Sequence, residues 1–231
     1  MTLNRHSEEI RPGDLLPAAG APSATFRERR REAVVAAFVD AAEKTIAEKG
    51  FERATMQDVA RAAGCAAGTI YLYFKNKEAL FSAMVARHVR EIGALHHAAL
   101  DAGTDPVDGL RRCVRSVLTY FNAHRSFFKV FYSASPGGRA HIPSNLDGSS
   151  LEEYLGFKRR LVDNFAAAQA RGAVRGDLPP EELAEFIDAV VVVTLARWSM
   201  SGSAPPPDEQ FRILWSLFGG GLGLGAADAT P

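Results

Sequence analysis

Residues 68–80 read GTIYLYFKNKEAL, the most informative stretch of this 231-residue chain. At about 100° per residue, Ile70 and Phe74 lie on one side of a helix and can anchor it to its own domain. The remaining arc, with Tyr71 at its edge, carries Thr, Leu and Tyr side chains that suit the groove of a DNA duplex better than open water. Tyrosine hydroxyls can donate to phosphates, and Leu or Thr methyl groups can contact thymine.

The residues around this stretch predict a helix-turn-helix. A capping pair, Thr25 and Glu28, begins a long helix over residues 25–50. Thr55 can cap a short helix over 55–63, and Gly64 suits a left-handed turn before a further helix over about 66–74. Two short helices joined by such a turn are typical of the motif. Asn76 can cap the following helix, which places Lys77 near its N-terminus.

The same residues resemble the DNA-binding domain of the TetR family of transcriptional regulators. The resemblance covers residues 26–87 without a gap, and it includes Phe38-x-x-Ala41-Ala42, Gly50-Phe51, the run from Thr55 to Gly64 and the run from Gly68 to Leu80. It implies operator contacts from the start of the second helix, along the third and just after it: Thr55, Gln57, Thr69, Tyr71, Leu72, Tyr73 and Lys77. Family members often carry a polar residue where this chain has Ala66, which is a poor N-cap, so we expect one cap to be missing.

Several of these assignments have an alternative. Tyr71 and Tyr73 also fit ordinary packing between helices, and Gln57 also fits a plain surface position. The basic run at 27–31 is either a solvated helix start or a phosphate contact.

Composition limits the function classes further. The chain carries 27 Lys and Arg against 27 Asp and Glu, yet residues 26–90 hold 12 against 8, a net charge of +4 in the segment with the motif. Two cysteines make no disulfide framework, and neither a signal peptide nor a membrane helix is indicated. We therefore expect a cytoplasmic protein without a cofactor.

Residues 88–222 predict a helical bundle with no catalytic constellation, so no enzyme is expected. His88, His96 and His97 lack an accompanying carboxylate cluster, and adjacent histidines diverge on a helix, so no metal site is predicted. The aromatic residues of this region fit an ordinary core, but they also fit the lining of a cavity for a small apolar or amphipathic effector. The candidates for such a lining are Phe121, Phe128, Phe131, Tyr154 and Trp198.

The predicted architecture is all-α: a flexible arm (1–24), a three-helix DNA-binding domain (25–87), a ligand-binding and dimerisation bundle (88–222) and a flexible tail (223–231). The last two long helices, about 180–200 and 208–218, carry apolar faces that either pair two subunits or bury within one subunit. A homodimer would hold two recognition helices at the spacing of a palindromic operator.

The function expected from the family is a ligand-responsive repressor. Alternatives are a family member without a small-molecule ligand, controlled by a partner or constitutive, and an all-α lipid- or small-molecule-binding protein or enzyme.

Overall fold

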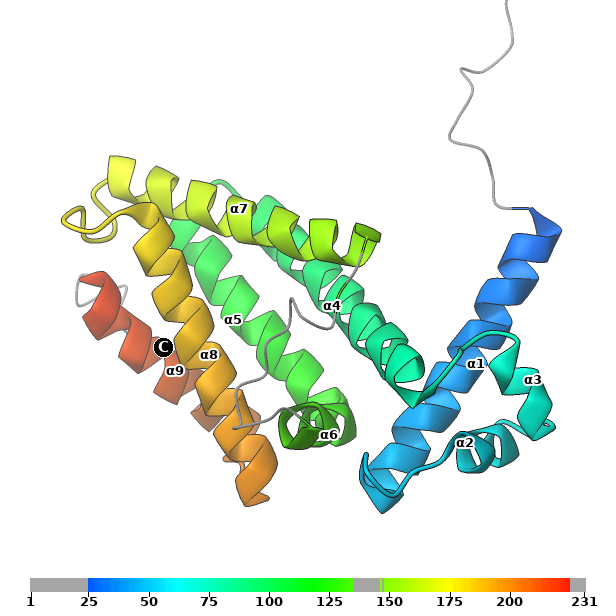
Figure 1. Ribbon diagram of the computed structural model, residues 1–231. Coiled ribbons are helices and arrows are strands. Elements are labelled where there is room, and N and C mark those ends of the chain that lie inside the picture. Colours follow the sequence, from blue (N-terminus) through cyan, green and yellow to red (C-terminus); the bar gives the residue numbers. More distant parts are fainter. Residues whose placement is uncertain (1–24, 135–145, 147, 225–231) are drawn as a thin grey trace, which may run out of the picture. The chain divides into compact units, whose positions relative to one another are not determined.

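The computed structural model describes residues 25–134, 146 and 148–224. These residues form helices and connecting turns without a strand (Figure 1), which confirms the all-α prediction. In chain order the helices are α1 (Phe26–Lys49), α2 (Met56–Ala62), α3 (Ala67–Tyr71), α4 (Lys77–Asp101), α5 (Pro106–Ala123), α6 (Arg125–Ala134), α7 (Gly148–Ala170), α8 (Pro180–Ser201) and α9 (Pro207–Leu222).

Some predicted segments lie wholly or partly outside the described residues. These are the arm (1–24), residues 135–145 and 147 of the predicted bundle, and the tail except for residues 223 and 224. The chain divides into two compact units within α1, after Ala36, and the elements discussed below belong to residues 37–224. The domain boundary expected near residue 87 stays a prediction.

The second half of α1 packs on the short helices that follow. Phe38, Ala42 and Ile46 are buried along this part of α1, and the Phe38 ring meets the rings of Tyr73 and Phe74 at centroid distances of 5.5 and 6.4 Å. Helices α2 and α3 pack on each other. Burial of Val59 and Ile70 then fixes the side of each short helix that faces the core.

Helix α3 is shorter than the sequence predicted, since it ends at Tyr71 and not near residue 74. The amide groups of Leu72 and Tyr73 donate to the carbonyl groups three residues earlier, at 3.2 and 3.0 Å, so the chain leaves the helix through a tightened turn. Ile70 and Phe74 are nevertheless both buried, as the helical pattern predicted.

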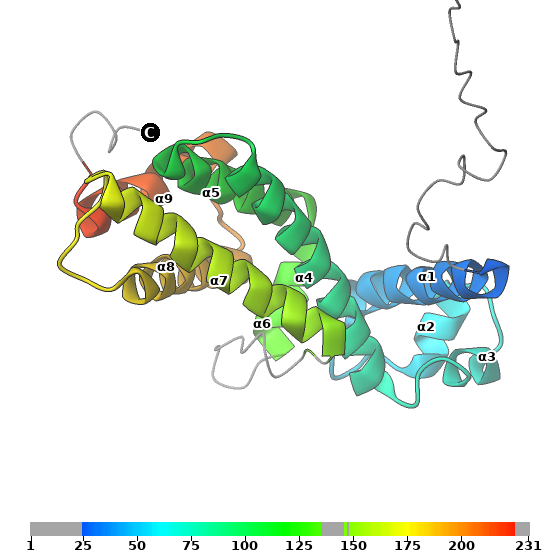
Figure 2. The ribbon, with the colours of Figure 1, turned by 90° about the horizontal axis from the view of Figure 1, so that it is seen from above.

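The remaining helices form a bundle in which α4 packs on α5 and α7, α5 on α9, and α8 on α6, α7 and α9 (Figure 2). His124, the C-cap of α5, separates α5 from α6. Helix α9 continues through Gly219–Gly221, where the sequence predicted an end. Gly221 has a steric reason to be there, because a Cβ atom at that position would lie 2.5 Å from Cε1 of Phe186 on α8.

None of the described helices is both long and apolar enough to cross a lipid bilayer.

Candidate functional site

A capping box fixes the start of α2. The Thr55 hydroxyl accepts a hydrogen bond from the Asp58 amide at 3.1 Å, and the Asp58 carboxylate accepts from the Thr55 amide at 3.2 Å. Lys49 forms an ion pair with the same carboxylate at 2.7 Å. The hydrogen bond to Lys49, followed by those to Thr55, lowers the pKa of Asp58 to about 2. Thr55 therefore positions α2, and its hydroxyl is already engaged within the protein.

The turn between α2 and α3 depends on Gly64, whose φ of +72° lies in the left-handed region. Ala66 occupies the N-cap of α3 and makes no side-chain capping bond, as the sequence predicted. We refer to residues 55–77, which run from the cap of α2 to the first residue of α4, as the helix-turn-helix segment.

The helix-turn-helix segment turns several large or polar side chains outward. Tyr71 and Leu72 are 47% and 79% exposed, and Gln57 is exposed at the start of α2. Thr69 is half-buried. Tyr73 is also half-buried and packs on Phe38, so the packing alternative holds for Tyr73 and fails for Tyr71. The operator contacts assigned to these residues stay predictions.

Lys77 lies in an unexpected environment. Its ammonium group donates to the carbonyl oxygens of Phe51 at 2.7 Å and Glu52 at 3.3 Å, and it lies 4.4 Å from the centre of the Phe51 ring. Asn76 caps α4 as predicted, accepting from the Ala79 amide at 2.9 Å. The lysine thus joins the start of α4 to the turn after α1, a role that the sequence did not indicate.

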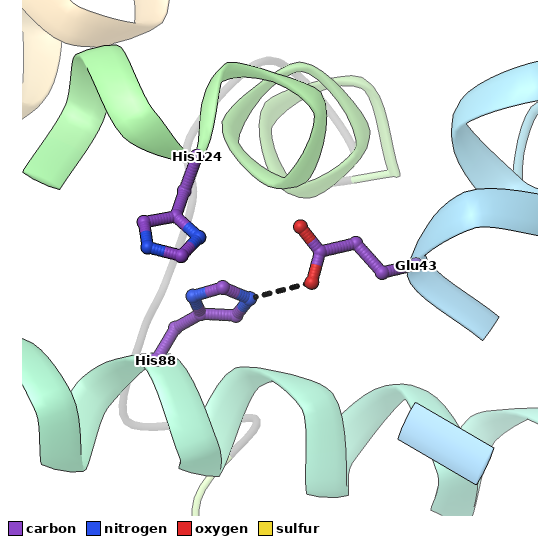
Figure 3. A group of neighbouring side chains, drawn as sticks. All are labelled: Glu43, His88 and His124. Carbon is purple, nitrogen blue, oxygen red and sulfur yellow. Dashed lines mark hydrogen bonds and ion pairs between the residues drawn. The ribbon is translucent and has the colours of Figure 1, made fainter. Parts of the chain in front are cut away.

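A polar cluster joins α1, α4 and the end of α5. Glu43 on α1 accepts one hydrogen bond from Arg87 at 2.9 Å and lies 3.2 Å from Nε2 of His88. His124, the C-cap of α5, completes the group, and ligand-type atoms of the three residues lie within 4.8 Å of one another (Figure 3). We call this the Glu43–His88–His124 cluster.

Charges within this cluster influence one another. Burial raises the pKa of Glu43, but its contact with His88 and the neighbouring charges outweigh burial, so the pKa lies below its usual value. Burial and the adjacent His88 lower the pKa of His124. Sequence reasoning considered His88 only with histidines close in sequence, so it did not bring these residues together.

An apolar pocket opens in the bundle, with about 120 Å³ of free space. Its walls come from α4, α5, α6, α7 and α8 and are mainly aliphatic and aromatic, including Val89, Ile92, Leu110, Val114, Val117, Phe128, Tyr154, Phe157, Leu161, Val191, Val192 and Leu195. Of the five predicted lining residues, Phe128 and Tyr154 lie in the wall. Phe121, Phe131 and Trp198 are buried outside it, where Phe121 meets both Phe128 and Trp198, so these three match the core alternative.

Four groups in the pocket wall carry polar atoms that the apolar pattern did not reveal: His96, Cys113, Tyr132 and Asp188. Nδ1 of His96 is buried without a hydrogen-bond partner, and burial, followed by the effect of His97, lowers the His96 pKa to about 4. Burial raises the pKa of Asp188, although Lys158 lies 3.2 Å away and opposes the shift. Burial also raises the pKa of the Cys113 thiol to about 12, so this thiol stays protonated at neutral pH.

The apolar faces of α8 and α9 divide between the core and the surface. Four large side chains on one face of α9 are buried within the subunit: Phe211, Leu214, Trp215 and Phe218. A different set of large apolar side chains is exposed on the two helices, namely Phe186, Val193, Met200 and Leu217. The buried side of α9 therefore matches the alternative that these faces bury within one subunit, and the pairing of two subunits through α8 and α9 stays a prediction.

Comparison with known proteins gives a family match for the helix-turn-helix region and similar proteins for most of the chain. Residues 38–84 match the family described as bacterial regulatory proteins, tetR family. The chain is 29% identical over 173 residues to the uncharacterized HTH-type transcriptional regulator YhgD of Bacillus subtilis, a match that covers 75% of this chain and 87% of that protein. It is 27% identical over 167 residues to the HTH-type transcriptional repressor ComR of Escherichia coli, covering 67% and 74%.

The fold has a similar solved counterpart in the transcriptional regulator FadR from Bacillus subtilis, determined in complex with stearoyl-CoA. The TM-score is 0.65 at 19% sequence identity, over 78% of this chain and 96% of that one. This likeness establishes the fold, while the matched motif lies in the outward-facing helix-turn-helix. Residues 38–84 therefore carry the helix-turn-helix of the TetR family of regulators, and the chain is a DNA-binding transcriptional regulator.

Proposed function

We propose that this protein is a repressor that binds a palindromic operator as a homodimer and is released from it by a small apolar or amphipathic effector. Residues 25–87 would read the operator, and residues 88–222 would bind the effector and the second subunit. The observation that carries the proposal is the outward face of the helix-turn-helix segment, where Gln57, Tyr71 and Leu72 project from a capped and packed scaffold. Such a regulator acts on chromosomal DNA in the cytoplasm, and the role requires no catalytic step.

Tyr71 and Leu72 are 47% and 79% exposed, so the described part of the subunit buries neither side chain. Large apolar and aromatic side chains at these exposures are costly in water and become useful when a groove covers them. The excess of four positive charges in residues 26–90 supports the same interpretation. The similar ComR protein bears the name of a repressor, which supports repression over activation.

The effector class follows from the apolar pocket. Its wall is largely apolar, and the unpartnered Nδ1 of His96 and the carboxylate of Asp188 offer polar contacts in it. A similar fold was solved with stearoyl-CoA, which supports an acyl or other elongated apolar effector. The free space of about 120 Å³ is close to that of an apolar cavity that accepts benzene, so a longer effector must widen the pocket.

Widening the pocket provides a mechanism for release. Val89, Ile92 and Gly93 on α4 line the pocket, and the same helix begins at the helix-turn-helix segment. An effector that binds the widened state more tightly shifts the population toward it, and a displaced α4 changes the spacing of the two reading segments of a dimer.

The exposed stripe on α8 and α9 supports the homodimer. Phe186, Val193 and Met200 lie seven residues apart along α8, and thus on one side of it, and Leu217 is exposed on α9, which packs against α8. We expect Val193→Asp to yield monomers in analytical ultracentrifugation at micromolar concentration. The matched control is Leu155→Asp, which charges an exposed leucine on α7 and should leave the dimer intact. A wild-type protein that is monomeric at this concentration would refute the homodimer.

Operator binding is tested on fragments selected by the protein from its own genome. Tyr71→Ala and Gln57→Ala should each weaken binding about tenfold or more in fluorescence anisotropy, since one good base contact contributes about 1–3 kcal/mol. Leu155→Ala, an exposed apolar residue far along the chain, serves as the control. If neither variant differs from wild type, the assigned face does not read DNA.

Lys77 allows a sharper version of this test. A phosphate contact at Lys77 predicts that Lys77→Ala reduces the salt slope of operator binding by about one. Purely internal bonding to Phe51 and Glu52 predicts an unchanged salt slope together with lower stability.

The effector response is tested by filling the pocket. A Cβ atom at Gly93 would meet nothing within 4 Å, so Gly93→Leu can place its side chain into the free space. We expect the variant to bind operator normally and to lose release by medium- and long-chain acyl compounds. Ala94→Leu, at the exposed neighbouring position, should respond as wild type does. Full release of the Gly93→Leu variant would show that effectors bind elsewhere.

A further inference from the structure

We propose that the Glu43–His88–His124 cluster is a binding site for a divalent transition-metal ion of the zinc type. The site would lie apart from the apolar pocket, and none of its three residues lines that pocket. The inference is independent of the proposed repressor function, because it concerns ligand atoms within one subunit.

Hydrogen bonds fix which nitrogen of His88 carries a proton. The Tyr120 hydroxyl lies in hydrogen-bond contact with the Glu91 carboxylate and 2.6 Å from Nδ1 of His88. An ionised carboxylate only accepts, so the single hydroxyl proton goes to Glu91. The Tyr120 oxygen must then accept from His88, which places the proton of the neutral imidazole on Nδ1.

This assignment leaves the lone pair of Nε2 directed at an acceptor. Nε2 lies 3.2 Å from Oε2 of Glu43, and two bare acceptors at that distance repel each other. Either a second proton or a metal ion between them removes the repulsion. Two ligand atoms bound at about 2.1 Å to a tetrahedral zinc ion lie about 3.4 Å apart, which is close to the observed separation.

His124 favours the metal ion over the proton. A proton shared by Glu43 and His88 needs no third group, yet one ring nitrogen of His124 turns toward the other two residues (Figure 3) and lies within 4.8 Å of their ligand atoms. The ring is held in place by stacking on Tyr120 at a centroid distance of 4.2 Å. Within the described part of the chain, the His124 ring makes no hydrogen bond that would compete with a metal.

The surroundings match the other requirements of a metal site. Three carboxylates, those of Asp40, Glu43 and Glu91, surround Arg87, so the local charge is negative without a further cation. Tyr120 holds the far nitrogen of His88, as second-layer partners of metal-binding histidines do. Glu43 is 18% exposed and His124 is half-buried, which leaves a path for the ion. Two imidazoles and one carboxylate favour zinc, cobalt or nickel over magnesium or calcium.

The test uses the full-length chain after dialysis against a chelator. Zn²⁺ is titrated in competition with a chromophoric chelator, and Co²⁺ absorption reports the coordination geometry. We expect one equivalent to bind. His124→Asn and Glu43→Gln should each weaken binding at least tenfold, and Tyr120→Phe should weaken it about 10–100-fold through the loss of the His88 partner.

His97→Asn is the matched control, because it removes another half-buried histidine of α4 that lies outside the cluster. It should bind Zn²⁺ as wild type does, and circular dichroism should show all four variants folded. The proposal is overturned if wild type binds no stoichiometric Zn²⁺, if the cluster variants bind as tightly as wild type, or if His97→Asn loses as much affinity. The first of these results would assign a proton to the His88–Glu43 pair.

Discussion

The helix-turn-helix segment and the helical bundle place their large side chains in opposite ways. In the segment, Tyr71 and Leu72 face outward, while short-range features hold the backbone: the Thr55 cap, the Gly64 turn and the Asn76 cap. In the bundle, Phe165, Leu214 and Trp215 are fully buried, and the polar groups near the pocket come from helices distant in sequence. A reading surface thus needs a rigid frame with few buried residues, whereas a pocket needs many packed residues around it.

Loss of a large core residue in the bundle should have the greatest effect on stability. Trp215 is fully buried, stacks on Phe211 at 5.8 Å and has the Arg111 guanidinium 5.0 Å from its ring. Trp215→Ala should lower the free energy of unfolding by about 3–5 kcal/mol, measured by chemical denaturation at fixed protein concentration. Ser216→Ala, at the exposed next position, should change it by less than about 0.5 kcal/mol. A small effect of Trp215→Ala would mean that α9 contributes little to the core.

The stability of the helix-turn-helix segment should instead depend on backbone conformation at the turn. Gly64→Ala forces a side chain into a left-handed φ of +72°, at a cost of about 1–2 kcal/mol, although a Cβ atom there would meet nothing within 4 Å. Gly68→Ala has equal space and no such φ, so it should leave the unfolding midpoint unchanged or slightly higher. Equal effects of the two substitutions would remove the conformational explanation.

A smaller loss is expected from the cap of α2. Thr55→Ala removes the capping box and should cost about 1 kcal/mol. Gln57→Ala, two residues later and exposed, should leave stability nearly unchanged while weakening operator binding. The two variants therefore distinguish a residue that stabilises α2 from a residue that contacts DNA. A loss of stability in Gln57→Ala would contradict this distinction.

The smallest expected difference between the two regions is their response to acid. Lys49 and Thr55 hold the pKa of Asp58 at about 2, and Arg175 does the same for Asp177 in the bundle. Because each folded-state pKa lies below the unfolded value, each carboxylate stabilises the fold above about pH 4 and loses that contribution as pH falls toward 2. Asp58→Asn and Asp177→Asn should each flatten the decline in thermal stability between these pH values. Curves that keep the wild-type slope would show that neither ion pair persists in solution.

Sequence reasoning succeeded where the structure is local. The Thr55 cap, the Gly64 turn and the Asn76 cap each act within three residues or alone, so the local sequence was sufficient to predict them. The absent cap at Ala66 was predictable for the same reason.

It failed where contacts are long-range. Glu43 and His88 lie 45 positions apart, and no periodicity relates them. Lys77 reaches carbonyl groups that lie 26 and 25 positions earlier, so the sequence indicated only its place near a helix terminus. The apolar face of α9 was visible in the sequence, but whether α5 or a second subunit covers it depends on the fold.

The bond between Lys77 and the turn after α1 has a mechanical consequence. Lys77 holds the Phe51 and Glu52 carbonyl oxygens, and Phe51 also packs on Phe81 one helical turn further along α4, at 5.0 Å. Besides the chain segment 72–76, which leads from α3 into α4, these contacts give α4 a direct connection to the turn preceding α2. We expect α2 to move together with α4 when α4 rotates. Two separate contacts, the Lys77 hydrogen bonds and the Phe51–Phe81 ring contact, hold α4 to the turn that precedes α2.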